Sequence, residues 1–445
     1  MRILIATFGT LGDLNPYLAL GVGLAARGHE PTIATHEYYR GAVESEGLGF
    51  HAVRPDAAPD NRRLFMRAMG PRRGPMVVLR EIVLPRLRTS YEDTCEAARQ
   101  ADLIVTHPLA FAGPIVAEER GLPWVSTVLA PLSFFSRHDF PVVPVLPRAW
   151  RLHWVPGMKG FLGWLFRAIS HSWTEPVREL RAELGLPPGS HPIFEGQHSP
   201  LLALGLFSRV LAEPQPDWPP STRLTGFLFR DPATRRESPG GEAAESAAAD
   251  ATRLDAFLDA GPPPIVFTLG SSAVVVAGTF YEESLAAARR IGMRAVLLVG
   301  DDPANRPSAP LGDDAIVLDR APYETLFPRA AAIVHHGGIG TLGQALRASR
   351  PMIVVPWSHD QPDNAHRAAR LGVARILHPK RYRSERAASA LRELLDDPAC
   401  VARAARIGET VRSEDGVAVA CDAIEEAALR ANGGGRSTPP ATRSA

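Results

Sequence analysis

The amino-acid sequence predicts an α/β protein made of two doubly wound parallel-sheet domains. Three observations support this fold class. The chain has 445 residues, too many for one compact domain of ~150 residues. An apolar run, a glycine-rich turn and a helical stretch follow one another in both halves, which is the pattern of parallel βα units. A proline-rich stretch of low complexity separates the two halves.

The first domain is expected to cover residues 1–211. Residues 3–6 form an apolar strand that ends in a glycine turn, and residues 16–27 form a helix. Pro16 suits the first turn of that helix and Gly28 suits its C-terminal cap. Further strands are expected at residues 32–34, 103–106 and 124–128.

Residues 212–264 are expected to form an interdomain linker, because they are rich in proline and include the Ala/Glu/Ser/Gly-rich stretch 237–252. The second domain covers residues 265–416. Its elements are expected in the order strand 265–268, turn 270–272, helix 282–291, strand 295–299 and strand 316–318. The Gly/Ser/Pro/Arg-rich segment 433–445 is expected to be a disordered tail without chemistry.

Charge and cysteine content exclude several classes of protein. The formal net charge is +1, from 49 basic and 48 acidic side chains, so no nucleic-acid partner is expected. The two lysines, Lys159 and Lys380, do not follow a glycine-rich run, which excludes a Walker-type NTPase. Cys95, Cys400 and Cys421 have no metal-binding spacing and favour a reducing cytoplasm. No apolar run approaches the ~18 residues of a membrane span.

The most informative segment is a buried strand that runs into twin histidines, a glycine turn and a helix, at residues 331–346. Glycines let backbone N–H groups approach an anion, and the start of a helix adds unpaired donors and a positive dipole end. The segment therefore predicts a diphosphate site. Gly338, Gly340 and Gly343 also match a dinucleotide fingerprint, with Asp360 near the position of a ribose-binding acid, so an NAD(P)-dependent oxidoreductase is an alternative.

The chain resembles the nucleotide-sugar-dependent glycosyltransferases of family 1, which have two Rossmann-like domains facing across a cleft, the GT-B architecture. The resemblance covers nearly the whole chain, and its layout is most similar to the rhamnosyltransferase of rhamnolipid synthesis and to sterol glycosyltransferase-like members. The residues that carry the signature of the C-terminal domain are His336, Gly338, Thr341, Pro356, the pair Asp360 and Gln361, and the pair Asn364 and Ala365.

The resemblance implies a nucleoside-diphosphate sugar as co-substrate, with no metal or other cofactor. The residues that it assigns to the donor diphosphate are Ser271, His336, Gly338, Gly340 and Thr341. Asp360 and Gln361 would bind the sugar, whose hydroxyl groups suit a carboxylate and an amide. The residues assigned to the nucleoside are Arg320, Ala321, Gln344 and Asn364. Arg320 stands where uridine-specific members often have Trp, and Gln344 where they have Glu, so UDP and dTDP donors both stay open.

Asp13 is the candidate catalytic base. It stands in the segment Gly12-Asp13, where most members of the family have Gly-His, and a subset of members has Gly-Asp. An aspartate is already unprotonated at pH 7 and can accept a proton from the acceptor hydroxyl. One in-line displacement would then invert the anomeric carbon. The structural alternative is that Asp13 caps the following helix. The resemblance also implies that the final helix, residues 417–432, returns to the first domain.

The acceptor is expected in the first domain, whose residues 134–173 are rich in Trp, Phe, Pro and Leu. His107, Phe134 and Trp150 are the candidate pocket residues. The same rings would also suit a hydrophobic core or a helix in peripheral contact with a membrane. A lipophilic acceptor is favoured. Besides the oxidoreductase, a nucleotide-sugar epimerase of the same fold and a non-catalytic partner subunit remain as alternatives.

Overall fold

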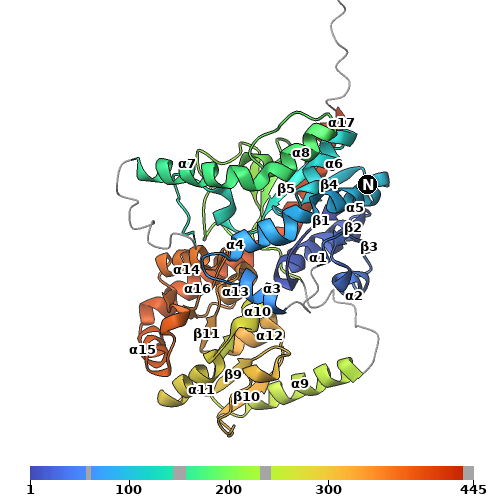
Figure 1. Ribbon diagram of the computed structural model, residues 1–445. Helices are drawn as coiled ribbons and strands as arrows, with labels where there is room; N and C mark the ends of the chain where they lie inside the picture. The colour runs from blue at the N-terminus through green and yellow to red at the C-terminus, as the bar shows by residue number, and fades with distance from the viewer. Residues whose placement is uncertain (57–61, 144–156, 231–241, 434–445) are drawn as a thin grey trace, which may run out of the picture.

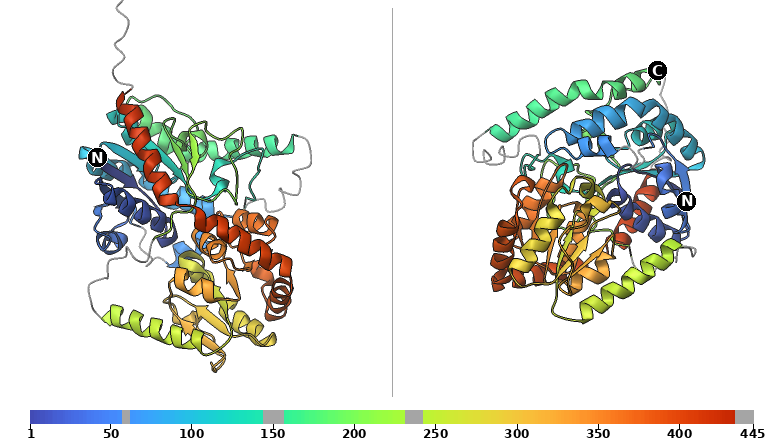
Figure 2. Two further views of the ribbon diagram at one scale, coloured as in Figure 1. Left: turned by 180° about the vertical axis from the view of Figure 1, so that it is seen from behind. Right: turned by 60° about the horizontal axis from the view of Figure 1, so that its bottom comes forward.

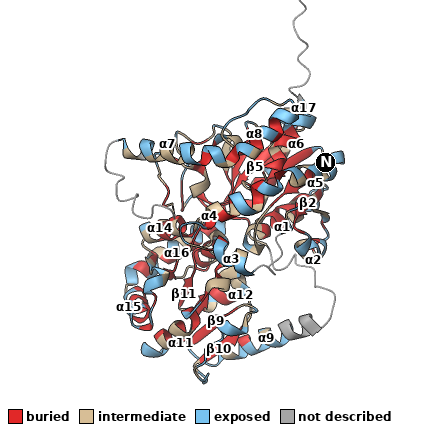
Figure 3. Ribbon diagram, in the orientation of Figure 1, coloured by how far each residue is buried: buried red, intermediate tan, exposed pale blue. Residues whose placement is uncertain are grey.

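The computed structural model describes residues 1–56, 62–143, 157–230 and 242–433. Two α/β domains lie one above the other, and each is built on a parallel sheet covered by helices (Figure 1). The buried residues concentrate in the two sheets and in the helix faces that pack on them (Figure 3). The predicted fold class is confirmed.

The first sheet has seven parallel strands in the order β3-β2-β1-β4-β5-β6-β7. The strands are β1 (Arg2–Ala6), β2 (Glu30–Thr35), β3 (Gly49–Ala52), β4 (Leu103–Thr106), β5 (Trp124–Val128), β6 (Ala203–Gly205) and β7 (Thr222–Leu224). The helices of this domain are α1 (Leu11–Ala26), α2 (Arg40–Glu44), α3 (Arg62–Ala68), α4 (Gly74–Val77), α5 (Leu87–Ala97), α6 (Ala112–Arg120), α7 (Met158–His171) and α8 (Glu175–Glu183).

The second sheet has six parallel strands in the order β10-β9-β8-β11-β12-β13. The strands are β8 (Ile265–Thr268), β9 (Ala295–Leu298), β10 (Ala315–Leu318), β11 (Ala332–His335), β12 (Met352–Val354) and β13 (Ala374–Ile376). The helices that follow β7 are α9 (Glu242–Asp259), α10 (Gly270–Ala273), α11 (Phe280–Arg290), α12 (Tyr323–Leu326), α13 (Ile339–Arg347), α14 (Gln361–Arg370), α15 (Ser384–Leu395), α16 (Pro398–Ser413) and α17 (Gly416–Gly433). In both sheets the strand order reverses beside the first strand, which is where α/β proteins bind ligands.

Two local expectations from the sequence differ from the structure. The first helix begins at Leu11 and not at Pro16, because Thr10 and Asp13 form a capping box five residues earlier and Pro16 is accommodated inside the helix. Residues 212–264 contain more regular structure than a linker needs. β7 pairs with β6 in the first sheet, and Leu254 and Leu258 of α9 are buried in a cluster with strands of the second sheet.

Helix α17 crosses from the second domain to the first (Figure 2). Its buried face joins the core of the first domain beside α1. Arg27 at the end of α1 donates to Asp422 at 2.5 Å and to Glu425 at 3.0 Å. His29 lies 2.8 Å from Glu425. The last helix therefore connects the two domains in addition to the chain between β7 and β8. None of the helices in the described residues is long and apolar enough to cross a membrane.

The close approach of α17 to α1 depends on Gly23. A Cβ added there would overlap Val417 Cγ1 and would lie 3.1 Å from Cys421 Sγ. We expect Gly23→Ala to lower the free energy of unfolding by about 1–3 kcal/mol, because the two helices must separate. Gly163 in α7 is the matched control, since its added Cβ meets nothing within 4 Å.

At Gly163 the same substitution should stabilise the protein by about 0.5–1 kcal/mol, through helix propensity alone. Thermal unfolding of the two variants checks this prediction. Equal changes in melting temperature for both would contradict the close packing of α17 on α1.

Candidate functional site

The candidate site lies where the loops that follow β1, β8 and β11 meet between the two domains. Ser271 Oγ of the second domain donates to Thr10 Oγ1 of the first at 3.4 Å. A Cβ added to Gly340 would lie 4.0 Å from the carbonyl oxygen of Gly12. The N-terminal ends of α1 and α13 are thus brought together at the strand ends. Such helix ends favour an anion between the domains.

His336 forms the floor of the site in the second domain. A Cβ at Gly338 would overlap its Nε2 atom, and one at Gly270, where φ is +61°, would lie 2.5 Å from its Cε1 atom. Only glycines leave room for this ring. His336 is 4% exposed, and its Nδ1 atom has no hydrogen-bond partner among the described residues. Burial lowers the pKa of His336 to about 4, so at neutral pH it offers one N–H and no charge.

The first turn of α13 supplies backbone donors beside this ring. Gly338 is the N-cap residue and provides no capping side chain. The first intrahelical bond runs from Leu342 N to Gly338 O at 2.9 Å. The N–H groups of Ile339, Gly340 and Thr341 come before it and have no acceptor within the helix. The arrangement suits a diphosphate, which can accept several such bonds.

Asp360 stands at the start of α14 and faces the same region. Burial and, second, the negative charge of Asp13 raise the pKa of Asp360 to about 7. Its Oδ2 atom accepts from Asn364 Nδ2 at 2.6 Å, and the same amide donates to Gly337 O at 2.9 Å. Asn364 therefore ties the Asp360 carboxyl to the glycine turn that follows β11. Asp360 does not cap α14 with its side chain.

Asp13 occupies the third position of α1, opposite the second domain. Its Oδ2 atom accepts from Thr10 N at 2.7 Å and from Thr10 Oγ1 at 3.1 Å. Burial raises the pKa of Asp13, while the two Thr10 bonds act in the other direction. Asp13 therefore takes part in capping through Oδ2, but as the third residue of the helix and not as its N-cap, which is Thr10. The second oxygen, Oδ1, takes part in neither of these two bonds.

Several predicted site residues have other surroundings. Gln361 is buried, and its Oε1 atom accepts from Trp357 N at 2.8 Å and Ser358 N at 3.3 Å, so its amide stabilises its own loop. Arg320 is exposed and forms an ion pair with Asp301. Ala321 is partly buried beside it, and Gln344 lies one turn into α13.

The predicted acceptor residues are placed as follows. The Phe134 ring is buried in a core cluster and stacks on Trp218, with centroids 4.0 Å apart. Burial lowers the pKa of His107 to about 3, and its Nδ1 atom accepts from Leu109 N at 3.0 Å. Trp150 lies outside the described residues. Core packing therefore explains Phe134 without any ligand.

The first domain also has a small cavity at the carboxyl end of its sheet, which sequence reasoning missed. Its volume is about 30 Å³, room for a methyl- or water-sized group. Thr7 Oγ1 on its wall is buried and has no hydrogen-bond partner in the part of the chain that the structure describes. The lining is mainly apolar and includes Phe8, Ala34, Leu87, Leu109 and Phe111. Nothing in the sequence around Leu87 marks α5 as part of this wall. Within the ranges that the structure describes, no group of three His, Cys, Asp or Glu residues could hold a metal ion.

Comparisons with known proteins identify the family of the chain. Residues 3–133 match the model of the glycosyltransferase family 28 N-terminal domain. Residues 284–424 match the erythromycin biosynthesis protein CIII-like C-terminal domain. The O-mycaminosyltylonolide 6-deoxyallosyltransferase of Streptomyces fradiae is 35% identical, over 96% of this chain and 97% of the relative.

A second relative, the sterol 3-beta-glucosyltransferase of Cryptococcus neoformans, is 29% identical over 95% of this chain, which spans 27% of that longer protein. Among solved structures, the glycosyltransferase VinC in complex with dTDP superimposes with a TM-score of 0.64 at 22% identity. That match covers 97% of this chain and all of VinC. The fold is therefore that of the GT-B glycosyltransferases.

The raised pKa of Asp360 predicts a pH-dependent cost in stability. Its pKa is 3.8 when unperturbed and about 7 in the folded protein, so the folded state binds more protons between these values. The free energy of unfolding should then fall as pH rises from about 4 to about 7. We expect Asp360→Asn, which cannot ionise, to have a higher melting temperature than the wild type at pH 8 and no advantage at pH 4.

The control is Asp313→Asn, an exposed carboxylate between β9 and β10, which should change neither value. Thermal unfolding without ligand at both pH values checks the prediction. If Asp360→Asn melts at or below the wild-type temperature at pH 8, ionisation of Asp360 does not destabilise the folded protein.

Proposed function

The chain belongs to the GT-B nucleotide-sugar glycosyltransferases, and we propose that it transfers a deoxyhexose from a dTDP-sugar to a hydroxyl of an apolar natural-product acceptor, with inversion. The observation that carries this proposal is that Asp13 of the first domain faces the His336 turn of the second domain. A base and a leaving-group site on opposite sides of a cleft are what a single in-line displacement needs.

The second domain supplies the site for the departing diphosphate. As the bond to the sugar breaks, negative charge grows on the leaving oxygen, and fixed N–H donors aimed at that charge lower the barrier. His336 and the first-turn N–H groups of Ile339, Gly340 and Thr341 are such donors, and Ser271 closes the site from the Gly270 turn. The neutral ring of His336 can also take up a proton when the charge arrives.

The first domain supplies the base. Both Thr10 donors bind Asp13 Oδ2, so that Oδ1 is available to accept the proton of the acceptor hydroxyl. Burial raises the pKa of Asp13 and makes it a stronger base than a solvated aspartate. The acceptor oxygen then attacks the anomeric carbon from the side opposite the diphosphate, and the configuration inverts.

Asp360 is proposed to accept hydrogen bonds from the sugar hydroxyls, because Asn364 holds its carboxyl beside the glycine turn. Gln361 can contribute only its amide nitrogen, since its oxygen is engaged by backbone N–H groups. From the resemblance to the family, the nucleoside is proposed to bind at Arg320, Ala321 and Gln344.

The proposed donor and acceptor classes rest on the relatives. The relative at 35% identity is named for the transfer of a 6-deoxyallosyl group to O-mycaminosyltylonolide, and the fold neighbour VinC was solved with dTDP. Gln344 in place of an acid fits a nucleoside that lacks one ribose hydroxyl. A sterol is the second candidate acceptor, because sterol glucosyltransferases are also relatives.

Replacing Asp13 by Asn separates catalysis from capping. Asn keeps an oxygen that can accept from Thr10 N, so the start of α1 and the affinity for a nucleoside diphosphate should be retained. We expect kcat to fall by on the order of 10²–10⁴-fold, because the general base is lost. Steady-state kinetics, with calorimetric binding of dTDP, checks this.

The control for capping is Thr10→Ala, which removes one bond to Asp13 Oδ2 and the weaker contact with Ser271 Oγ, and leaves the carboxylate. We expect this variant to have a clearly lower melting temperature than the wild type and a kcat close to that of the wild type. An Asp13→Asn protein with near wild-type turnover would refute the catalytic assignment.

The donor class is tested by thermal shifts with dTDP, UDP and NAD at equal concentration. A ligand that binds only the folded protein raises the melting temperature according to its affinity. We expect the largest shift from dTDP, a smaller one from UDP and none from NAD. A larger shift with UDP would assign a uridine donor, and a shift with NAD alone would favour an oxidoreductase.

A further inference from the structure

Helix α14 is held by the first domain at two separate places. In the loop before the helix, Ser358 Oγ donates to Gly70 O at 3.0 Å, and His359 Nε2 lies 2.9 Å from Ala68 O. Further along, the helix contacts the loop that follows Phe134. Asp360, the proposed sugar-binding carboxylate, stands between these two attachments.

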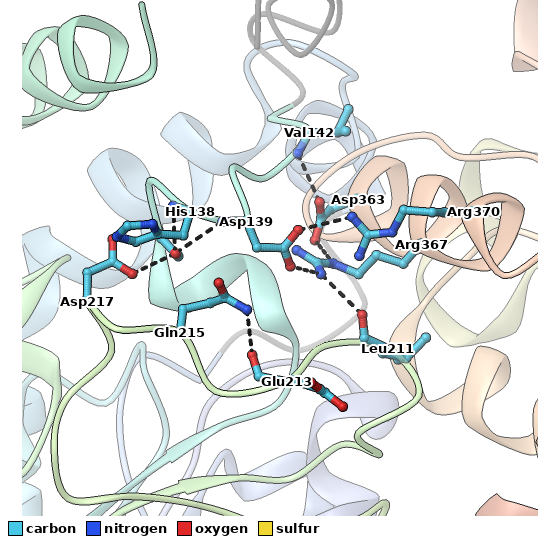
Figure 4. A network of polar contacts seen from close by, with 11 residues as sticks. His138, Asp139, Val142, Leu211, Glu213, Gln215, Asp217, Asp363, Arg367 and Arg370 are labelled. Carbon is cyan, nitrogen blue, oxygen red and sulfur yellow. Dashed lines mark hydrogen bonds and ion pairs between the residues drawn. The ribbon is translucent and has the colours of Figure 1, made fainter. Parts of the chain in front are cut away.

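The second attachment is a network of four charged side chains (Figure 4). Asp363 and Arg367 pair along α14 at 2.7 Å. Asp363 Oδ1 also accepts from Val142 N at 2.9 Å. Arg367 binds Asp139, and Arg370 contacts the same carboxylate at 3.1 Å. Asp139 and Val142 belong to the first domain, so the network joins the two domains.

Burial makes this network sensitive to the contact between the domains. The side chains of Asp363 and Arg367 are only 2% and 3% exposed. Buried charges are stable only when they are paired and hydrogen-bonded. If the first domain moved away, Arg367 would lose Asp139 and its bond to Leu211 O at 3.2 Å, and Asp363 would lose the Val142 N–H. The two Asp and two Arg side chains together balance their charges only in the closed arrangement.

The position of this network along the helix links it to the site. Arg367 follows Asp360 by seven residues, about 10 Å along one rigid helix. Asn364, on the turn between them, binds both the Asp360 carboxyl and Gly337 O. A shift of α14 relative to the first domain would therefore move Asp360 relative to Asp13.

We propose that Asp139, Asp363 and Arg367 are positioning residues that seat α14 against the first domain and so hold Asp360 opposite Asp13 in the closed cleft. The proposal rests on the proposed function in one respect, the roles of Asp360 and Asp13. The three residues touch neither donor nor acceptor and act through the helix.

The loop that carries Asp139 offers a matched control. Asp217 of the first domain holds the other end of this loop, accepting from Ser136 Oγ at 2.6 Å and from Arg137 N at 2.8 Å. The contacts of Asp217 stay inside the first domain (Figure 4). Asp217→Asn therefore loosens the loop without removing a bond to α14, whereas Asp139→Asn removes the charge that faces Arg367.

The test compares the full-length wild type, Asp139→Asn, Asp139→Glu and Asp217→Asn, each with bound dTDP. Hydrogen exchange of the amides in residues 358–370 reports how firmly α14 is held. We expect faster exchange there in Asp139→Asn only, and a fall in kcat/KM for the acceptor on the order of ten- to a hundredfold, as for the loss of a charge-assisted hydrogen bond. The Kd for dTDP should not change, and Asp139→Glu should recover most of the loss.

Two results would overturn the proposal. One is that residues 358–370 exchange in Asp139→Asn at the wild-type rate, and the other is that Asp139→Asn and Asp217→Asn change the exchange rate equally. Should Asp139→Asn fail to fold, Arg370→Gln takes its place, because it removes only the outer bond to Asp139 from an exposed side chain. The exchange comparison does not depend on turnover. A wild-type protein that transfers no sugar would refute the proposed function, while the exchange rates would still decide whether Asp139 holds α14 in place.

Discussion

Burial of titratable side chains between the two domains is the constraint on which the whole site depends. It shifts the three central side chains toward their neutral forms, raising the pKa of Asp13 and Asp360 and lowering that of His336. Asp360, whose pKa is about 7, is therefore partly protonated at neutral pH, which weakens its repulsion of an anion bound between the domains. Attraction for a bound anion comes from the N-terminal end of α13 and from oriented N–H groups. These groups are neutral and need no counter-ion.

The contact between the two domains also explains why α14 has so many polar contacts. One of its faces serves the site, through Asp360 and Asn364, and another meets the first domain, through Asp363 and Arg367. The partners in the first domain are mostly backbone groups, among them Val142 N and the carbonyl oxygen of Leu211. The position of α14 is thus set by backbone groups of the first domain together with the Asp139 carboxylate.

The sequence was sufficient for the features that depend on local order along the chain. Alternation of apolar runs and glycine turns predicts the two parallel sheets, and the twin histidines before Gly337 mark the turn that the structure brings to the cleft. The sequence was insufficient where the role of a residue depends on the direction in which its side chain points. Gln361 turns to the backbone of its own loop, and Phe134 stacks on Trp218, a partner far away in sequence. The predicted start of the first helix was wrong because the prediction gave more weight to Pro16 than to the capping box formed by Thr10 and Asp13.

The path of α17 limits how these domains can be exchanged between related enzymes. Residues 416–433 follow the second domain in sequence, yet Ala420, Cys421 and Ile424 belong to the core of the first domain. A single crossover in the chain between β7 and β8 would pair a foreign last helix with the native α1. A chimera that imports a new second domain should therefore have a second junction near Glu414 and retain the original terminal helix.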